Sequence, residues 1–283
     1  MRLFSKASAD HSDDEAERQN LLSERSDFYL QEAFKALRTN VMFSLTGESK
    51  CKIITVTSSM LGEGKSYTAT NLALSFAMMD KRVLLIDCDL RRPKLARLLQ
   101  LNSSAGLTNV LMDPNNMKSA LLPYRKIGLD VILSGSIPPN PSELLGSKRM
   151  EKLLEVLRGS YEYIILDAPP INMVTDAAIL ANYSDGVLFV VRAGIADQRG
   201  VSHAVEQLEY TNAKILGFVL NGVDVESSSY GYKRYGYKRY GYRRYGYKGY
   251  GYKRYGYQPY GYGSNTDQTS SATSEDKTAQ PKA

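Results

Sequence analysis

The sequence is short of cysteine and has no long apolar run, and each shortage excludes a class of protein. Its only two cysteines, Cys51 and Cys88, each stand beside a predicted strand, so neither a disulfide framework nor a thiolate metal site is expected. We interpret both as small buried apolar side chains. No apolar run approaches the roughly 20 residues that span a bilayer, and the start of the sequence lacks the apolar core of a secretory signal. A cytoplasmic protein is therefore expected.

Acidic residues are missing from one segment, and this explains the net charge of +6. Residues 230–263 hold nine of the 36 Lys and Arg and no acid, so the other 27 bases face 30 Asp and Glu, a net charge of −3. The basic character therefore belongs to this segment alone. Such a segment attracts nucleic acid, anionic lipid and acidic proteins alike, so its charge selects none of them.

The apolar pattern predicts one α/β domain between two polar ends. Six short β-branched runs alternate with segments of helical spacing, and they cover residues 52–57, 82–87, 130–134, 161–167, 186–191 and 214–221. Runs that are apolar on both faces and joined by helix-length crossovers indicate a mostly parallel sheet with helices on both faces. We expect a disordered leader over 1–26, the domain over 27–225 and a disordered tail over 226–283.

The tail contains a tyrosine repeat that cannot form a core. Residues 230–262 repeat the pattern Y-G-Y-[K/R]-[R/G] and hold 14 of the 21 tyrosines in the chain. Each repeat contains glycine and none contains an aliphatic residue, so burial cannot offset the entropy lost on ordering.

The strongest motif is a phosphate-binding loop between the first predicted strand and a helix. Residues 59–66 read SMLGEGKS, which is a P-loop with serine in place of the first glycine. Gly62 and Gly64 let backbone N–H groups face phosphate oxygens, and the next helix presents its positive end to the same anion. Lys65 is expected to reach the β- and γ-phosphates, and the Ser66 hydroxyl to coordinate Mg²⁺. The candidate ATP-binding residues here are Gly62, Glu63, Gly64, Lys65 and Ser66.

Three aspartates follow predicted strands at the edge where the ligands of open α/β sheets bind. Asp167 ends one strand, which suits a Walker B carboxylate. Asp87 and Asp89 end another strand, and alternation along an extended chain points both to one side. Three carboxylates near a phosphate pocket predict an Mg²⁺ site, formed with Ser66, and a base for a hydroxyl nucleophile.

An amphipathic helix is predicted over residues 28–45, ahead of the first strand. Its apolar residues recur at helical spacing, at Leu30, Ala33, Phe34, Leu37 and Val41. Glu32, Lys35 and Arg38 follow one another at steps of three on the polar face. These side chains can pair with each other or with a neighbouring subunit.

Together these segments resemble the bacterial tyrosine kinases of capsule and exopolysaccharide synthesis, which are relatives of the septum-site and partition ATPases. The resemblance covers about residues 28–262 and rests on EAFKALRTN, SSMLGEGKS, LLIDCDLRRP, SGSIPPNPSELL, YIILDAPP and the tyrosine cluster. It implies a P-loop NTPase-like fold and an ATP- and Mg²⁺-dependent kinase that phosphorylates its own tail in trans within an oligomer. It also implies control of polysaccharide synthesis and export.

The resemblance assigns roles to individual residues. Asp87 and Asp89 match the Walker A′ motif, so that either would help bind Mg²⁺ and activate the tyrosine hydroxyl, and Asp167 matches Walker B. Asn221 resembles an asparagine that contacts the base in related ATPases. Arg91, next to the A′ motif, either stabilises phosphate charge or belongs to a solvated basic loop, and the same holds for Arg92.

Further roles concern assembly and partners. Glu32, Lys35 and Arg38 match the E-x-x-R-x-x-R helix that joins subunits into a ring, and Lys35 weakens that interface because lysine cannot form a bidentate fork. Similar proteins act with a separate transmembrane adaptor, which recruits them to the inner face of the membrane, and with a tyrosine phosphatase. The candidate phosphoacceptors are Tyr230, Tyr232, Tyr235, Tyr237, Tyr240, Tyr242, Tyr245, Tyr247, Tyr250, Tyr252, Tyr255, Tyr257, Tyr260 and Tyr262.

Two other functions compete with this interpretation. A switch ATPase of the partition or septum type shares the P-loop and the fold, but it has no evident need for a tyrosine tail. Its P-loop also carries a lysine near the start, where this chain has Thr57, Ser58 and Ser59. The alternative is a binding protein whose repeat stacks on single-stranded nucleic acid or adheres to polysaccharide. We expect no nucleic-acid partner.

Overall fold

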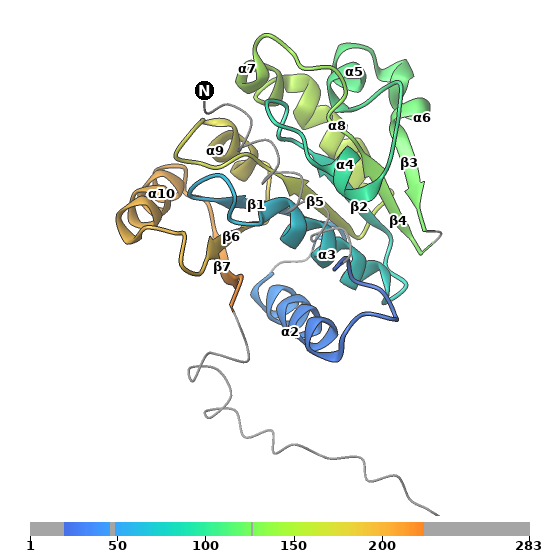
Figure 1. Cartoon of the computed structure of the whole chain (residues 1–283). Coiled ribbons are helices and arrows are strands. Elements are labelled where there is room, and N and C mark those ends of the chain that lie inside the picture. Colours follow the sequence, from blue (N-terminus) through green and yellow to red (C-terminus); the bar gives the residue numbers. More distant parts are fainter. Residues whose placement is uncertain (1–19, 46–48, 126, 224–283) are drawn as a thin grey trace, which may run out of the picture. The chain divides into compact units, whose positions relative to one another are not determined.

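The computed structural model describes residues 20–45, 49–125 and 127–223 (Figure 1). The helices are α2 (Phe28–Ser44), α3 (Lys65–Ala77), α4 (Leu95–Leu99), α5 (Leu107–Met112), the 3-10 helix η1 (Pro114–Asn116), α6 (Met117–Ala120), α7 (Pro141–Leu145), α8 (Lys148–Arg158), α9 (Asp176–Ala181) and α10 (Gln198–Tyr210). The strands are β1 (Lys52–Ser58), β2 (Val83–Asp87), β3 (Leu121–Tyr124), β4 (Leu129–Ile132), β5 (Tyr163–Asp167), β6 (Gly186–Arg192) and β7 (Ile215–Asn221).

In the described part of the chain the strands form one seven-stranded sheet in the order β3-β4-β2-β5-β1-β6-β7. All neighbours pair in parallel except β3 and β4, which are antiparallel. Because parallel strands share a direction, their carboxyl ends meet at one edge of the sheet. This confirms the predicted mostly parallel α/β fold.

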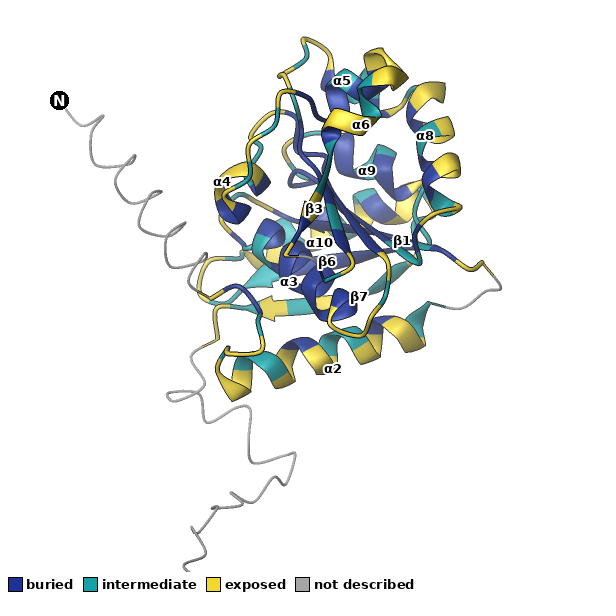
Figure 2. Cartoon of the chain, turned by 90° about the vertical axis from the view of Figure 1, so that its right-hand side faces the viewer, coloured by how far each residue is buried: buried dark blue, intermediate teal, exposed yellow. Residues whose placement is uncertain are grey.

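Helices cover both faces because alternate strand residues point to opposite sides. On one face Ile54 and Leu85 belong to an apolar cluster that includes residues of α2, α3 and α4. On the other face their neighbours Ile53 and Leu84 belong to a cluster with residues of α5 to α10. Strands β1, β2 and β5 and helix α3 are almost entirely buried, whereas the edge strands β3 and β7 are largely half-buried or exposed and α2 exposes its outer side (Figure 2). The P-loop helix α3 is therefore held in place by core packing along its whole length.

The strand at the β4 edge of the sheet was not predicted from the sequence. β3 is only four residues long and contains Pro123, which lacks a backbone N–H for the ladder. Such a strand is tolerated at a sheet edge. All six predicted strands are present.

The end of the predicted leader is packed on the domain. Leu21 and Leu22 are buried in the cluster around α3, and the Leu22 backbone N–H donates to the Asn71 side chain at 2.7 Å. The Tyr67 hydroxyl of α3 donates to the Asn20 carbonyl at 3.0 Å. Two adjacent leucines were enough to attach a segment that its charged surroundings made look disordered. The domain boundaries otherwise stay predictions.

Residues 1–19 and the tail from residue 224 onward, with the tyrosine cluster at 230–262, lie outside the described residues. Cys51 and Cys88 are both free and buried, as predicted. Within the described ranges, none of the helices has the length and apolar character needed to cross a membrane.

Candidate active site

The P-loop joins β1 to α3 at the carboxyl edge of the sheet, and its backbone needs glycine. Gly62 and Gly64 have φ angles of 84° and 88°, in the left-handed region that other residues rarely adopt. A Cβ atom on Gly64 would also collide with the side-chain amide of Asn221. Lys65 follows directly as the first residue of α3. Both glycines are therefore required by the shape of the loop.

Glu63 binds the loop to itself. Its buried carboxylate accepts hydrogen bonds from the Ser59 hydroxyl at 2.9 and 3.0 Å and from the Met60 backbone N–H at 2.7 Å. The loop is thus closed by its own side chains. A direct contact of Glu63 with nucleotide stays a prediction, while the structure gives its side chain this internal role.

The three predicted aspartates meet around Lys65. Asp87 and Asp167 end neighbouring strands and are direct partners in the β2–β5 register. The Lys65 ammonium lies 2.9 Å from Oδ2 of Asp89 and 3.7 Å from Oδ1 of Asp167. All four side chains are buried. Residues that stand up to 102 positions apart in the sequence therefore form one buried charged cluster.

Burial shifts the proton affinities in this cluster. Loss of water, followed by the nearby charge of Asp167, raises the pKa of Asp87 to about 8. Burial likewise raises the pKa of Asp167. For Lys65 burial acts to lower the pKa, but the carboxylates of Asp167 and Asp89 outweigh it and raise the pKa above its usual value. A carboxyl group able to take up a proton near neutral pH thus lies beside a lysine that remains charged.

The donor set fits Mg²⁺ held together with phosphate oxygens. Neither carboxylate oxygen of Asp167 has a hydrogen-bond partner among the described residues, although both are buried. Buried acceptors without a hydrogen bond are costly, and the Lys65 ammonium, 3.7 Å from Oδ1, offsets that cost only in part. No group of three or more His, Cys, Asp or Glu side chains in that part of the chain forms a ready metal cage. Mg²⁺ usually needs only one or two carboxylates besides phosphate and water. Asp167 is therefore the side chain here best suited to that ion.

Two residues at the ends of β6 and β7 hold the other side of the P-loop. The Asn221 side chain donates to the Glu63 carbonyl at 3.0 Å, and Arg192 donates to the Gly62 carbonyl at 2.9 Å. Asn221 thus touches the loop backbone, and its predicted contact with the base stays a prediction. Arg192 was missed because nothing in the sequence LFVVRAG marks it.

Of the two arginines after the A′ motif, one is engaged within the chain. Arg91 pairs with Asp176, the first residue of α9, with Nε at 3.0 Å from Oδ2. Arg91 therefore does not belong to a solvated basic loop. The side chain of Arg92 is exposed, and only its backbone N–H reaches the site, where it donates to Asp89 at 3.0 Å. Asp176 was not singled out from the sequence, in which TDAA looks like an ordinary helix start.

The polar face of α2 divides in two. Lys35 and Glu32 form an exposed ion pair at 2.8 Å. Arg38 instead donates to the Ser75 carbonyl of α3 at 2.5 Å, within its own chain. The role of these three residues in assembly stays a prediction. The 14 predicted phosphoacceptor tyrosines lie outside the described residues.

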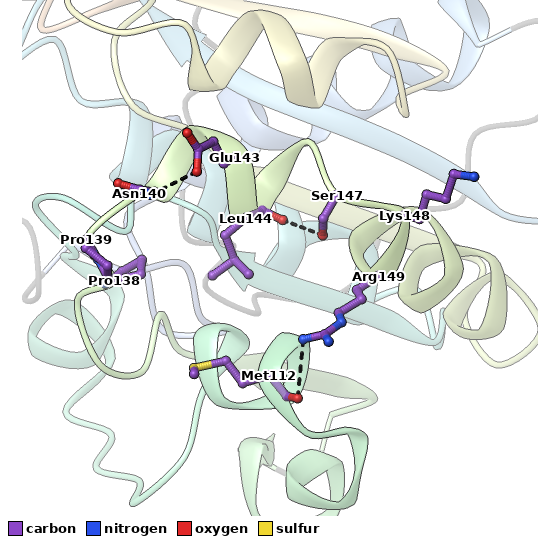
Figure 3. A pocket seen from close by; sticks show the side chains of 9 residues that line it. All are labelled: Met112, Pro138, Pro139, Asn140, Glu143, Leu144, Ser147, Lys148 and Arg149. Atoms are coloured by element: carbon purple, nitrogen blue, oxygen red, sulfur yellow. Dashed lines mark hydrogen bonds between the residues drawn. The ribbon is translucent and has the colours of Figure 1, made fainter.

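A separate pocket of about 550 Å³ lies beside α7 and the start of α8, with Met112, Pro138, Pro139 and Leu144 among its lining residues (Figure 3). Among its polar lining residues, Asn140 donates to Glu143 at 2.9 Å and Arg149 donates to the Leu111 carbonyl at 3.2 Å. None of its lining residues belongs to the P-loop or to the acidic cluster. The pocket is therefore distinct from the candidate nucleotide site.

Known proteins resemble this chain over most of the α/β domain. Residues 51–216 match a family model described as an AAA domain. The chain is similar to the tyrosine-protein kinase YwqD of Bacillus subtilis, with 41% identity over 202 residues, which covers 71% of this chain and 85% of that protein. It is also similar to the solved kinase domain of the Escherichia coli tyrosine kinase ETK, with a TM-score of 0.66, 36% identity, and coverage of 72% of this chain and 80% of that one.

A more distant likeness extends to the septum site-determining protein MinD of Pyrococcus horikoshii, solved with Mg-ADP. It has 21% identity and a TM-score of 0.52, and covers 60% of this chain and 70% of that one. At this level of identity the likeness shows a shared fold only.

Proposed function

The chain belongs to the bacterial tyrosine-protein kinases, and from this membership we propose that it transfers the terminal phosphoryl group of ATP to tyrosines of its own tail. The observation that carries the proposal is the Lys65 ammonium, 2.9 Å from Asp89, at the start of the helix that follows the P-loop. This arrangement combines a phosphate-binding cation with carboxylates at one point. The 14 tyrosines at 230–262 supply the acceptor hydroxyls.

Each group in the cluster has a task in this reaction. The P-loop backbone and Lys65 bind the phosphates of ATP, and Ser66 and Asp167 hold Mg²⁺, which supplies positive charge to the phosphate oxygens. The tyrosine oxygen forms a bond to the terminal phosphorus while the bond to the ADP oxygen breaks. A carboxylate accepts the phenolic proton.

The two A′ aspartates are unequal candidates for that proton acceptor. Asp89 is paired with Lys65 at 2.9 Å, and this pairing suits it to a charged role beside the metal. The pKa of Asp87 is raised to about 8 by burial, and a base works best when its pKa lies near the working pH. Of the two aspartates, we therefore propose Asp87 as the base.

Phosphorylation in trans requires that subunits meet, and we propose the polar face of α2 as the contact. Since Arg38 also ties α2 to α3, the cleaner variant is the double change Glu32→Ala and Lys35→Ala, which removes only the exposed pair. It should lower the oligomeric mass with little change in Tm. Light scattering that still finds the mass of the unaltered oligomer would rule out this contact.

We further propose that the kinase regulates capsular or exopolysaccharide synthesis and export. In this proposal a transmembrane adaptor recruits it to the inner face of the membrane, and a tyrosine phosphatase resets it. These roles rest on the resemblance of the sequence segments to that class of kinase. Co-purification with membrane proteins of the source cell tests them.

Incubation of the purified full chain with ATP and Mg²⁺, followed by phosphotyrosine mass spectrometry, tests the main proposal. We expect several phosphotyrosines within 230–262 in the unaltered chain and none in the Lys65→Ala variant. ATP hydrolysis without any phosphotyrosine would instead identify a switch ATPase of the partition or septum type. If the chain forms no phosphotyrosine and hydrolyses no ATP, the result would indicate a binding protein.

A further inference from the structure

Three loops that leave neighbouring strands meet at one buried carboxylate. Asp176 follows the loop after β5, Ser142 lies in α7 after β4, and Arg91 follows β2. These strands are adjacent in the sheet, in the order β4-β2-β5. Two of the three loops begin at the aspartates of the active site. The meeting point therefore joins the acidic side of the site to α7.

The contacts among the three side chains form a closed set. Arg91 donates to both oxygens of Asp176, from Nε at 3.0 Å and from Nη2 at 3.3 Å. Nη2 also donates to the Ser142 hydroxyl at 2.9 Å, and this hydroxyl donates to Oδ1 of Asp176 at 2.5 Å. The Asp176 side chain is fully buried. A two-pronged pairing of this kind fixes the direction of a guanidinium as well as its position.

The loop that Arg91 anchors is the one that holds the A′ carboxylates. Its backbone N–H groups at Arg92 and Leu95 donate to Asp89 at 3.0 Å and to Asp87 at 3.1 Å. A shift of this loop would move both hydrogen bonds and with them the carboxylates that face Lys65. The anchor itself contacts Asp176 and Ser142 and makes no hydrogen bond to Lys65.

We infer that Arg91, Asp176 and Ser142 are positioning residues that hold the A′ loop, and through it Asp87 and Asp89, in the geometry that the kinase reaction needs. The inference rests on the proposed roles of these two carboxylates. It assigns Arg91 a task other than contact with the transferred phosphoryl group. Displacements of about 1 Å in an active site can cost about 100-fold in rate, so an anchor outside the site can govern turnover.

The test uses the full chain with Arg91→Lys, Asp176→Asn and the double variant. Lysine keeps the charge but loses the fork, and asparagine keeps the shape but loses the charge. We expect each single change to lower kcat by about 10–100-fold, as is usual for residues that orient metal ligands. The Mg²⁺ concentration at half-maximal ATP binding should rise as well. The double variant should be no worse than the worse single variant, because both changes release the same loop.

Arg158→Lys is the matched control. Arg158 pairs with Asp185 at 3.2 Å, and Asp185 precedes β6 at the opposite, amino-terminal edge of the sheet. It should lower Tm as the test variants do, yet leave kcat and the Mg²⁺ dependence unchanged. A kcat for Arg91→Lys equal to that of the control would overturn the inference. So would losses that add in the double variant, because they would place Arg91 on the phosphoryl group, independent of Asp176.

The outcome is separable from that of the proposed function. If the unaltered chain forms no phosphotyrosine, the kinase proposal fails, while Mg²⁺-dependent binding of ATP still measures the anchor. If the unaltered chain is active and Arg91→Lys changes neither kcat nor Mg²⁺ dependence, only the anchor fails.

Discussion

The two sides of the site are held by bonds of different kinds. On the β6–β7 side, Arg192 and Asn221 donate to carbonyl groups of the P-loop. On the β4–β2–β5 side, Arg91 pairs with the buried carboxylate of Asp176. A neutral hydrogen bond typically contributes about 0.5–1.5 kcal/mol and one to a charged group about 1.5–3 kcal/mol; the Arg91 side chain is 39% exposed, but its carboxylate partner is fully buried. The loop side should therefore adjust when a ligand arrives, and the acidic side should stay in place.

Lys65 is where the two sides meet, since the P-loop supplies the lysine and the strands supply its carboxylate partners. We expect Lys65→Ala to reduce tail phosphorylation at least as much as loss of a key charge-stabilising donor does, about 10²–10³-fold. The carboxylates left behind can take up protons, so the fold should survive. Phosphotyrosine mass spectrometry measures the first effect and thermal unfolding the second. Normal phosphotyrosine content in a folded variant would remove Lys65 from the site.

Asp87→Asn separates two effects of the buried Asp87 carboxyl group, which are its cost to stability and its part in the reaction. Because burial raises the pKa of Asp87 in the folded state to about 8, the folded protein binds this proton more tightly than the unfolded chain does. Stability is therefore lost as pH rises from about 4 toward 8. Asparagine removes the titration, so the variant should be inactive yet more stable at pH 8.

Thermal unfolding at two pH values checks this prediction. Each kcal/mol gained by Asp87→Asn should raise Tm by about 2–4 °C in a domain of this size. The advantage of the variant over the unaltered protein should be larger at pH 8 than at pH 5.5. A variant that loses stability at pH 8 would show that the Asp87 carboxylate is favourable where it lies.

Asn221→Ala and Arg192→Ala probe the weaker, loop side. Each removes one donor to a loop carbonyl, so the dissociation constant of ATP should rise by about 3–10-fold, in line with about 1 kcal/mol per bond. If Asn221 only supports the loop, ATP and GTP should be affected equally. A loss confined to ATP would instead support the predicted contact of Asn221 with the base.

The smallest expected effect concerns the two cysteines, which should not react with an alkylating reagent in the folded protein. Burial raises the pKa of Cys51 to about 11 and raises that of Cys88, between the two A′ aspartates, well above its usual value. Only the thiolate reacts with alkylating reagents. Iodoacetamide at pH 7.5 should therefore modify neither cysteine in the folded protein and both after unfolding. Rapid modification of Cys88 alone would reveal opening on the acidic side.

Much of the fold was predictable because its strands are apolar on both faces and its P-loop has a fixed order of residues. Gly62, Gly64, Lys65 and the three aspartates could be found in the sequence, since each follows a strand that periodicity reveals. β3 could not, because four residues with a proline carry no periodic signal.

The supports of the site were harder to find than the site itself. Asp176 and Arg192 act through contacts with residues 85 and 130 positions away, and no local pattern marks such partners. Arg38 also shows that local spacing does not reveal a residue's partner. Helical spacing placed it on the polar face of α2, yet its guanidinium reaches the end of α3. Spacing reveals which face of an element a residue occupies, but only packing decides which neighbour it meets.

The attachment of residues 20–26 also constrains the order in which the protein can fold. Leu22 bonds to Asn71 and accepts a hydrogen bond from Arg125, partners 49 and 103 positions further along the chain. During synthesis this segment leaves the ribosome before its partners do, and domains form as their residues emerge. It must then wait for α3 and the β3–β4 hairpin before it can dock, and contacts over such separations form late. Until then the apolar surface of α3 that it covers is open to solvent and to other nascent chains.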